Sequence, residues 1–251
     1  MPRYGSMADV RAFMPNPPEI QTFKIEPWNL KGAQIINLLA EVNCEKSDAL
    51  LPKAMHPSIP SYAMFNVTVY PDSPAGKFGI GEVRVASRAG VRPRGFVLRS
   101  FVDNEAARRE LANRWGYPVA PGDVYMRTFH DRVVARVSSQ GRVVLELEML
   151  DRDYIAGGDI QYLSSMHLAR NKADGNLILA QIDPEWTFSR AERGRPRINT
   201  FDASAFGAGD NLVVENIISV SYTICDVTLG NIRYFCDPDK PAFQGTTQVA
   251  A

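Results

Sequence analysis

The sequence predicts an α+β protein that is mainly β, with its strands arranged as an antiparallel sandwich or barrel. Short runs rich in Val, Ile, Phe and Tyr recur along the chain and are separated by Gly, Pro, Asp and Asn. Only a few segments favour a helix. The expected strands cover residues 34–42, 62–70, 80–86, 95–102, 123–137, 142–150, 177–188 and 212–229.

Two helices are expected between these strands. The clearer one covers residues 104–115, where Asp103 or Asn104 can cap the first turn and Gly116 can close the last one. It leads directly into Tyr117 and Pro118. A shorter helix is expected over residues 47–51, started by Ser47 and stopped by Pro52.

The length and composition favour a single large domain. With 251 residues, 45% of them hydrophobic, the chain can bury a sizeable core. Residues 1–20 are rich in proline and residues 240–251 are small and polar, so both are expected to be terminal arms with little core of their own. The domain therefore spans residues 21–239, and either arm can pack on a neighbouring subunit.

The charge balance excludes several classes of partner. Lysine plus arginine and aspartate plus glutamate both number 28, so no net positive field attracts nucleic acid or an anionic membrane. The basic segment 190–197 is expected to be a solvent-exposed loop. No apolar run approaches the roughly 20 residues that span a bilayer, and residues 1–18 lack the apolar stretch of a signal peptide. We expect a cytoplasmic protein whose partner is a small molecule or another subunit.

The sequence predicts no metal and no cofactor. The three cysteines lack a CxxC pair, which favours structural thiols, and the three histidines lie in separate segments without metal-ligand spacing. The glycines near residue 79 do not form a dinucleotide fingerprint. These residues are Cys44, Cys225 and Cys236; His56, His130 and His167; and Gly76, Gly79 and Gly81.

Three segments, taken in order, resemble the acetoacetate decarboxylase family. Residues 48–55 (DALLPKAM) are similar to an early segment of that family, and residues 101–118 (FVDNEAARRELANRWGYP) to its helix and following tyrosine-proline pair. Residues 215–229 (ENIISVSYTICDVTL) are similar to its C-terminal strand. The order and spacing carry the resemblance, which covers roughly residues 30–236. It implies a double-layered, conical β-barrel with few helices, an apolar interior pocket and assembly into homo-oligomers.

The resemblance fails at the residues that carry the family's chemistry. In the family, two lysines follow the proline, and one of them forms an imine with the substrate ketone. Val119 and Ala120 occupy these positions. The family's active-site arginine aligns with Ala33, one glutamate with Asn66, and the other with Ile80 or, after a two-residue shift, Glu82.

Glu82 and Arg84 are the leading candidates for replacement chemistry. Period-two alternation places both on one face of a strand, with Val83 and Val85 on the other. If the polar face is turned inward, an acid and a cation share the pocket. The alternative is that both face solvent and the valines form the core.

Other candidates have equally simple structural explanations. Arg99 is a candidate for binding a substrate carboxylate, because a guanidinium holds both oxygens, or it is a surface arginine. Tyr117 and Asn66 are candidates for binding substrate, although Tyr117 is also suited to a core position at a helix end. Glu146 and Glu148 alternate with leucines, so they line an outer face or supply a general acid.

Together these residues predict a cofactor-independent lyase or decarboxylase that acts on an oxo-acid or aromatic carboxylic acid without a Schiff base. Glu82 would be the acid/base, with Glu146 as a further candidate, and Arg84 or Arg99 would hold the carboxylate. The alternatives are a hydratase, dehydratase, isomerase or cyclase acting on an oxo-compound, and a non-catalytic small-molecule binding protein.

Overall fold

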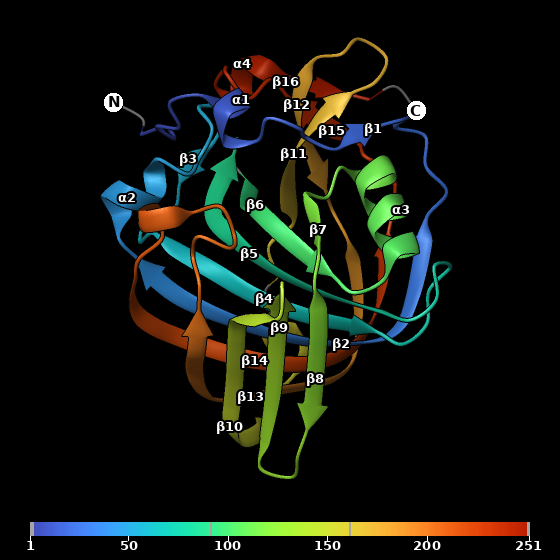
Figure 1. Ribbon diagram of the computed structural model, residues 1–251, viewed down its shortest axis with the longest axis vertical. Coiled ribbons are helices and arrows are strands. Elements are labelled where there is room, and N and C mark those ends of the chain that lie inside the picture. Colours follow the sequence, from blue (N-terminus) through green and yellow to red (C-terminus); the bar gives the residue numbers. More distant parts are fainter. Residues whose placement is uncertain (1–2, 91, 161, 250–251) are drawn as a thin grey trace.

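The computed structural model describes residues 3–90, 92–160 and 162–249 and consists mainly of strands (Figure 1). The helices are α1 (Val10–Phe13), α2 (Cys44–Asp48), α3 (Glu105–Trp115) and α4 (Ala242–Gly245), with 3₁₀ turns η1 (Gly157–Asp159) and η2 (Gly209–Asn211). The strands are β1 (Glu19–Ile20), β2 (Trp28–Val42), β3 (His56–Pro57), β4 (Tyr62–Tyr70), β5 (Phe78–Ala89), β6 (Arg92–Val102), β7 (Val119–Pro121), β8 (Asp123–Thr128), β9 (Arg132–Ser139), β10 (Arg142–Tyr154), β11 (Ser165–Asn171), β12 (Leu177–Ile182), β13 (Glu185–Phe201), β14 (Val214–Leu229), β15 (Tyr234–Cys236) and β16 (Thr246–Gln248).

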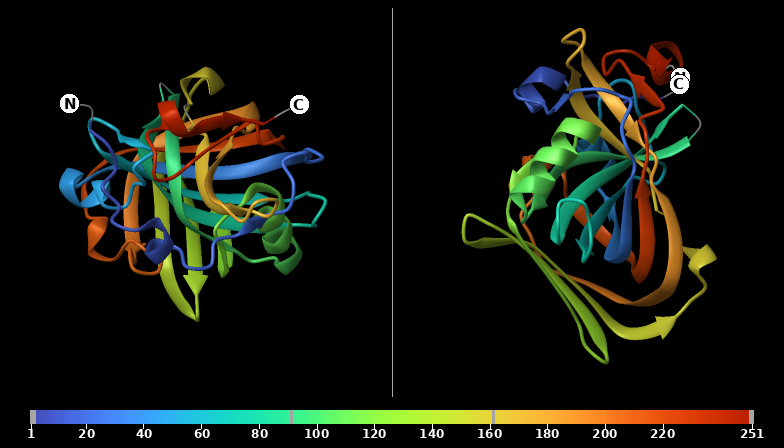
Figure 2. Two further views of the ribbon diagram at one scale, coloured as in Figure 1. Left: turned by 90° about the horizontal axis from the view of Figure 1, so that it is seen from above. Right: turned by 90° about the vertical axis from the view of Figure 1, so that its right-hand side faces the viewer.

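All strands belong to one strongly curved, largely antiparallel sheet. Its order is β16-β15-β12-β11-β6-β5-β4-β2-β14-β13-β10-β9-β8, with β1, β3 and β7 paired at its sides. The end of the sheet formed by β8 and β9 folds back across β4 and β5, which produces two layers (Figure 2). The mainly β, α+β class is confirmed. The sheet is not closed, however, because its end strands β16 and β8 are not paired with each other in the described parts of the chain.

The strands β2, β4 and β5 are buried on both faces, so alternate residues enter two different cores. Val83 and Val85 of β5 and Phe65 of β4 pack in the first core, against Val137 and its neighbours on β9. Residues of the opposite parity enter the second core, which lies under α3 and contains Trp28, Ile35, Phe78, Ile80 and Trp115. The second face is the one that carries the candidate site.

Two glycines allow the layers to approach closely. A Cβ atom on Gly81 would lie 2.2 Å from Cγ2 of Val137 on β9, and one on Gly79 would lie 2.6 Å from Cβ of Val124 on β8. Real Cβ atoms do not approach other atoms so closely. Only glycine fits at these two positions without a shift of the layers, because side chains of the folded-back strands occupy the space that a Cβ atom would need.

The expected helix over residues 104–115 is confirmed as α3. The Asn104 side chain accepts a hydrogen bond from the amide of Ala107 at 3.0 Å, and Gly116 ends the helix in the left-handed conformation, with φ 65°. The shorter helix is displaced from its expected position. It begins at Cys44 rather than Ser47, because the Asn43 side chain caps it by accepting from the amide of Lys46.

Several expected strands have different limits. The run 123–137 is a hairpin of β8 and β9, and β11, which contains His167, was not expected. The segment 190–197 is not a loop but part of β13. Arg193, Arg195 and Arg197 alternate along this strand and pair with carboxylates of the neighbouring β10, as Arg195 does with Asp151 at 3.0 Å. These cross-strand ion pairs stabilise a basic strand there.

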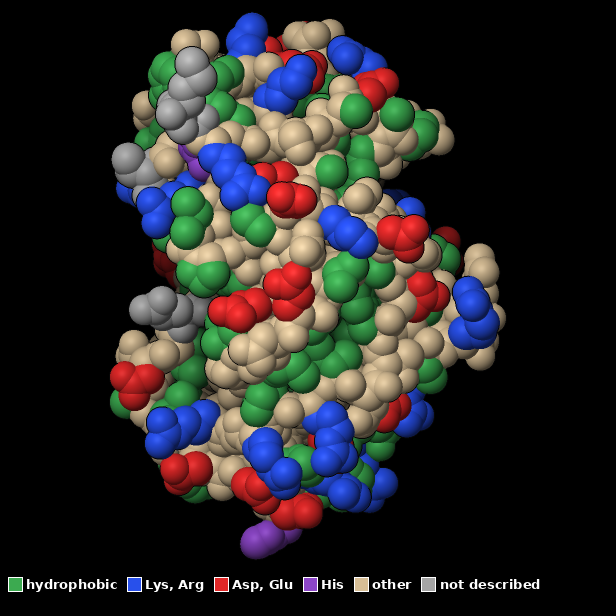
Figure 3. Space-filling model, turned by 90° about the vertical axis from the view of Figure 1, so that its left-hand side faces the viewer, with side chains coloured by type: hydrophobic (Ala, Val, Ile, Leu, Met, Phe, Trp, Pro, Cys, Tyr) green, Lys and Arg blue, Asp and Glu red, His purple; other side chains and the backbone are tan. Residues whose placement is uncertain are grey.

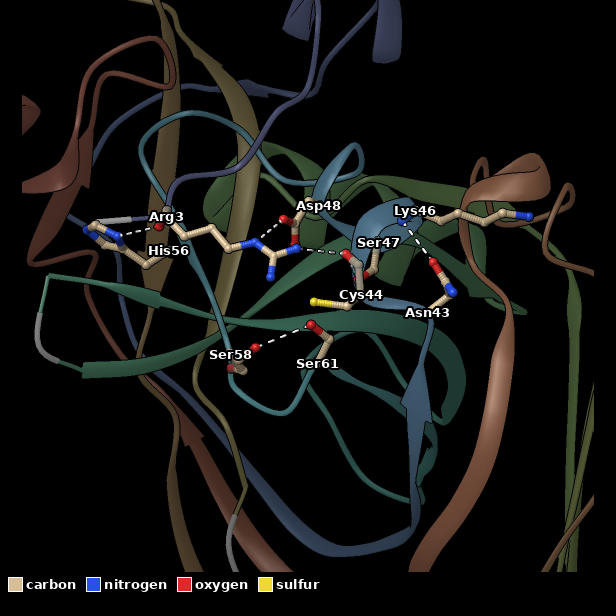
Figure 4. A network of polar contacts seen from close by, with 9 residues as sticks. All are labelled: Arg3, Asn43, Cys44, Lys46, Ser47, Asp48, His56, Ser58 and Ser61. Carbon is tan, nitrogen blue, oxygen red and sulfur yellow. Dashed lines mark hydrogen bonds and ion pairs between the residues drawn. The ribbon is translucent and has the colours of Figure 1, made fainter. Parts of the chain in front are cut away.

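The N-terminal arm packs closely on the domain. Met7, Val10 and Ile20 are buried, and β1 pairs with β11. Arg3 forms an ion pair with Asp48 of α2 at 2.5 Å, and the carbonyl of Arg3 lies 2.9 Å from Nδ1 of His56 (Figure 4). The arm therefore contributes core residues and polar contacts to the domain.

Acidic and basic side chains are interspersed on the face of the molecule shown in Figure 3. On the face shown in Figure 3 no large region carries a single sign of charge, which agrees with the balanced composition. None of the helices in the described ranges has the length and apolar character needed to cross a membrane.

Candidate active site

An enclosed cavity lies in the second core, against the face of β4 and β5 that carries their even-numbered residues. Its enclosed volume is about 30 Å³, room for roughly two water molecules. Its walls combine apolar side chains with a small group of polar ones. The lining residues are Ile35, Met64, Asn66, Thr68, Tyr70, Ile80, Glu82, Arg84, Tyr117, Tyr162, Pro184, Trp186, Val227 and Leu229.

Glu82 and Arg84 form a buried ion pair in this cavity. Their side chains are 3% and 10% exposed. Arg84 donates to Oε1 of Glu82 through Nε at 3.0 Å and also through Nη2, while Ser100 on the neighbouring strand β6 donates to Oε2 at 3.1 Å. The polar face of β5 therefore faces inward, and the valines of its other face form the first core.

Arg84 remains charged although it is buried. Burial by itself disfavours the guanidinium, but the adjacent Glu82 carboxylate outweighs this effect and raises the pKa of Arg84. Arg84 also donates through Nη1 to the carbonyl of Leu163 at 2.7 Å. These three contacts leave two of the five guanidinium N–H groups for other acceptors.

Three tyrosines add hydroxyl groups to the cavity wall. Burial raises the pKa of Tyr70, Tyr117 and Tyr162 well above the usual value, and the Glu82 carboxylate raises the pKa of Tyr117 further. All three are therefore neutral phenols at physiological pH and are able to donate hydrogen bonds. The hydroxyl of Tyr162 lies 2.6 Å from Oγ1 of Thr223, and its ring packs against Trp186.

A buried histidine lies behind Tyr117. The ring centroids of His167 and Tyr117 are 4.0 Å apart, and Nδ1 of His167 is 2.8 Å from the carbonyl of Trp115. Burial lowers the pKa of His167 to about 3, so the imidazole is neutral. Its Nδ1 is then the donor to the carbonyl. His167 was expected only as a residue without metal-ligand spacing, and here it supports a cavity wall.

Asn66 reaches the cavity from the strand beside Glu82. The two residues are direct cross-strand partners between β4 and β5. The Asn66 Oδ1 atom accepts a hydrogen bond from Thr68 at 2.9 Å, which orients the amide. The structure thus brings together four of the residues expected at the site: Asn66, Glu82, Arg84 and Tyr117.

The structure does not bring Arg99 or Glu146 into this cavity. Arg99 lies on the opposite face of β6 and donates to the carbonyl of Ala205 at 2.8 Å. Glu146 forms an ion pair with Arg136 at 2.6 Å and accepts from Asn199, and Glu148 pairs with arginines of β9 and β13. The prediction that Arg99 and Glu146 share a site with Glu82 is therefore wrong. Arg99 lies on the other face of its strand, and the pairing of β9, β10 and β13 directs the two glutamates toward cross-strand arginines.

No lysine lines the cavity. All seven lysines of the chain belong to the described residues, and all are exposed. Val119 and Ala120, at the family's lysine positions, form part of β7, which pairs with β6 beside Ser100. Val119 packs at the edge of the second core. No lysine of the chain is therefore placed to form an imine with a substrate in this cavity.

Sequence reasoning did not identify Tyr162, Trp186 and Tyr70 as site residues. Tyr70 and Thr68 could have been found, because they continue the period-two series that includes Asn66 on β4. Tyr162 lies in the connection that follows η1, where no periodicity assigns a direction. In the described parts of the chain no group of three or more His, Cys, Asp or Glu side chains is placed to hold a metal ion, and Cys44, Cys225 and Cys236 are unpaired thiols.

Comparison with solved structures finds the same fold in acetoacetate decarboxylases. The enzyme from Legionella pneumophila subsp. pneumophila str. Philadelphia 1 has a TM-score of 0.72 at 19% identity, over 82% of this chain and 86% of that one. The enduracididine biosynthesis enzyme MppR complexed with pyruvate has a TM-score of 0.65 at 18% identity, over 81% and 88% of the two chains. An acetoacetate decarboxylase-like enzyme from Sphingomonas wittichii RW1 has a TM-score of 0.65 at 15% identity, over 82% and 90%.

Because these sequence identities are low, the structural similarities establish the fold of this chain and not its activity. A comparison with curated protein sequences found no match. The family description "Acetoacetate decarboxylase (ADC)" matches residues 13–237, which is most of the chain and includes α3, the cavity strands and β14. The chain therefore belongs to the acetoacetate decarboxylase family.

Proposed function

We propose that this protein is a cofactor-independent lyase that decarboxylates a short oxo-acid or an aromatic carboxylic acid without forming a Schiff base. The observation that carries the proposal is the buried Glu82–Arg84 pair, which lies in an enclosed cavity with neutral tyrosines and no lysine. Membership of the acetoacetate decarboxylase family supports a reaction at a small organic acid.

The substrate itself supplies the electron sink. When the bond between the α-carbon and the carboxylate breaks, carbon dioxide leaves and the bonding electron pair moves toward a carbonyl or para-hydroxyaryl group of the substrate. In a β-keto acid the product is an enolate, which then takes a proton at carbon. Hydrogen-bond donors that are already oriented in a dry site stabilise such an oxyanion far better than water does.

The cavity contains groups suited to each part of this reaction. The two unused N–H groups of Arg84 can bind the departing carboxylate, and Tyr117 and Tyr162 can donate hydrogen bonds to the developing enolate oxygen. Among the described residues, Glu82 is the one carboxylate in the cavity wall, and it can relay a solvent proton to carbon. Ser100 holds Glu82 in place from the other side.

The size of the cavity limits the substrate. At about 30 Å³ it holds roughly two water molecules, so even a four-carbon acid requires some lining side chains to rotate. Tyr162 and Trp186, which pack on each other at 5.4 Å between centroids, border the cavity away from the β4–β5 wall. We infer that small acids are preferred and that these two side chains move when substrate binds.

The proposal is tested by measuring carbon dioxide release from a panel of short β-keto acids and para-hydroxyaryl acids. The expected result is turnover of at least one acid by the wild type, a large loss in Tyr117→Phe, and no covalent adduct after borohydride is added with substrate. An imine trapped at any lysine would contradict the Schiff-base-free reaction. Tight binding of an acid without turnover would instead identify a binding protein.

A further inference from the structure

A second, larger pocket lies on the opposite face of β6 from the active-site cavity. Its volume is about 620 Å³. It is bordered by β6, the start of α3, the segment from Ala120 to Asp123 and the turn between β9 and β10. We call it the arginine groove, because Arg99, Arg108 and Arg142 line it from three separate elements.

The three arginines of the groove have no acidic partner. Most arginines of the chain form ion pairs with carboxylates, but none of these three does so within the described residues. Two aspartates also border the groove. One of them, Asp103, accepts a hydrogen bond from the amide of Gly79 through Oδ1 at 2.7 Å. With three arginines and two aspartates, Asp103 and Asp123, in its lining, the groove therefore keeps an excess of one positive charge.

Two of the guanidinium groups are held in position by the backbone. Arg99 donates through Nη1 to the carbonyl of Ala205 at 2.8 Å, and Arg108 donates through Nη1 to the carbonyl of Val102 at 2.9 Å. Each is oriented through one nitrogen and keeps other N–H groups for a ligand. Arg142 follows the tight turn at Gln140 and Gly141, whose φ angles are 51° and 75°. Fixing a donor before the ligand arrives lowers the entropy lost on binding.

We propose that the arginine groove binds a phosphate group, either as free phosphate or pyrophosphate or as part of a small phosphorylated molecule. A single carboxylate presents two oxygens in one plane and is satisfied by one guanidinium fork. A phosphate presents three terminal oxygens in different directions, which suits arginines that approach from three elements. Ser138 and Ser139 border the same groove and add hydroxyl donors.

This site is independent of the proposed lyase reaction. Along β6 the side chains alternate, so Ser100 faces Glu82 while Arg99 and Phe101 face the groove. A ligand in the groove would touch the strand that positions Glu82 without entering the cavity. Glu82→Gln should therefore leave phosphate binding unchanged, which separates a failure of one proposal from a failure of the other.

Calorimetric titration with inorganic phosphate and with pyrophosphate, at constant ionic strength, tests the site. The wild type should bind pyrophosphate at millimolar or lower concentration, and Arg99→Gln and Arg142→Gln should each weaken binding about tenfold or more. Arg170→Gln is the matched control, because Arg170 also donates to a backbone carbonyl, that of Gly175 at 2.8 Å, and lies outside the groove. Acetate should not compete with phosphate or pyrophosphate for the groove.

Three results would overturn the proposal. They are no binding of either probe to a folded wild type, equal loss of affinity in Arg170→Gln, and acetate binding as tight as that of phosphate. Light scattering on the same variants measures their oligomeric state and tests whether the groove is instead a contact between subunits. If Arg142→Gln dissociates an oligomer and leaves phosphate binding unchanged, the groove is a contact between subunits and the proposal is wrong.

Discussion

Glu82 and Arg84 depend on each other because each compensates the charge of the other inside the protein. Glu82→Gln keeps the size of the side chain and a hydrogen-bonding end but removes the titratable proton. We expect the chemical step to slow by about 10²- to 10⁴-fold. We also expect a loss of roughly 3 kcal/mol of stability, because Arg84 is left as an uncompensated buried charge.

Adding Arg84→Met to Glu82→Gln distinguishes these two effects. The double variant buries no charge, so urea unfolding should show stability restored toward the wild-type value while turnover remains lost. If Glu82→Gln alone turned over an identified substrate at the wild-type rate, its assignment as the proton relay would be wrong.

His167 makes the stability of the fold depend on pH. Its pKa is lowered from 6.5 to about 3 in the folded protein, chiefly by burial and further by the positive charge of Arg84. Between these values the unfolded chain binds a proton that the folded chain does not. Stability from this group is therefore complete above about pH 6.5 and falls as the pH drops toward 3, by about 1.4 kcal/mol per pH unit.

Urea unfolding from pH 4 to pH 7 measures this contribution. His167→Asn retains a donor for the carbonyl of Trp115 but does not titrate, so its stability should change less with pH than that of the wild type. His130→Asn is the control, since His130 is exposed. Equal slopes in the wild type and His167→Asn would show that other groups dominate the acid response.

The approach of β9 to β5 limits what Gly81 can become. In Gly81→Ala the new methyl group would meet Val137 at 2.2 Å, so one of the two layers must shift. We expect a destabilisation of about 1–3 kcal/mol, measured by chemical denaturation. Gly158→Ala is a matched control because no atom lies within 4 Å of its Cβ position. A neutral Gly81→Ala would mean that the layers are not packed as described.

Strand β5 also explains which predictions about the candidate site were correct. Alternation along β5 correctly groups Glu82 with Arg84, because a strand's side-chain period is local. Alternation alone does not say which face is inside. That choice follows from β9 covering the odd-numbered face, a contact between strands about fifty residues apart in sequence.

At the scale of the whole molecule, the N-terminal arm and the sheet should unfold together. Met7 is 4% exposed and belongs to the first core, so Met7→Ala should remove roughly 2 kcal/mol or more of stability. The loss should appear as a lower midpoint of one cooperative transition. Arg11→Ala, an exposed change in the same arm, should alter stability by less than about 0.5 kcal/mol.

A separate early transition in the Met7→Ala variant would show that the arm is an independent unit. Two transitions in the wild type would contradict our prediction of a single domain, which agrees with the placement of the described strands from β1 to β16 in one sheet. Circular dichroism and tryptophan fluorescence should therefore report the same midpoint, because Trp28 and Trp115 lie in the second core.

By itself the sequence determined the mainly β class, the capped helix α3 and the shared face of Glu82 and Arg84. These features depend on periodicity and end-capping within short segments, where the physical cause lies in neighbouring residues. The absence of the family's lysines was also readable directly from Val119 and Ala120.

Only the tertiary structure decided which polar residues meet. Arg99 was separated from the cavity because it lies on the other face of β6, and Glu146 because Arg136 and Asn199 face it across the sheet. Tyr162 entered the cavity from an irregular connection. Such positions depend on strand pairing between distant segments and on loop paths, and no pattern within one segment contains that information.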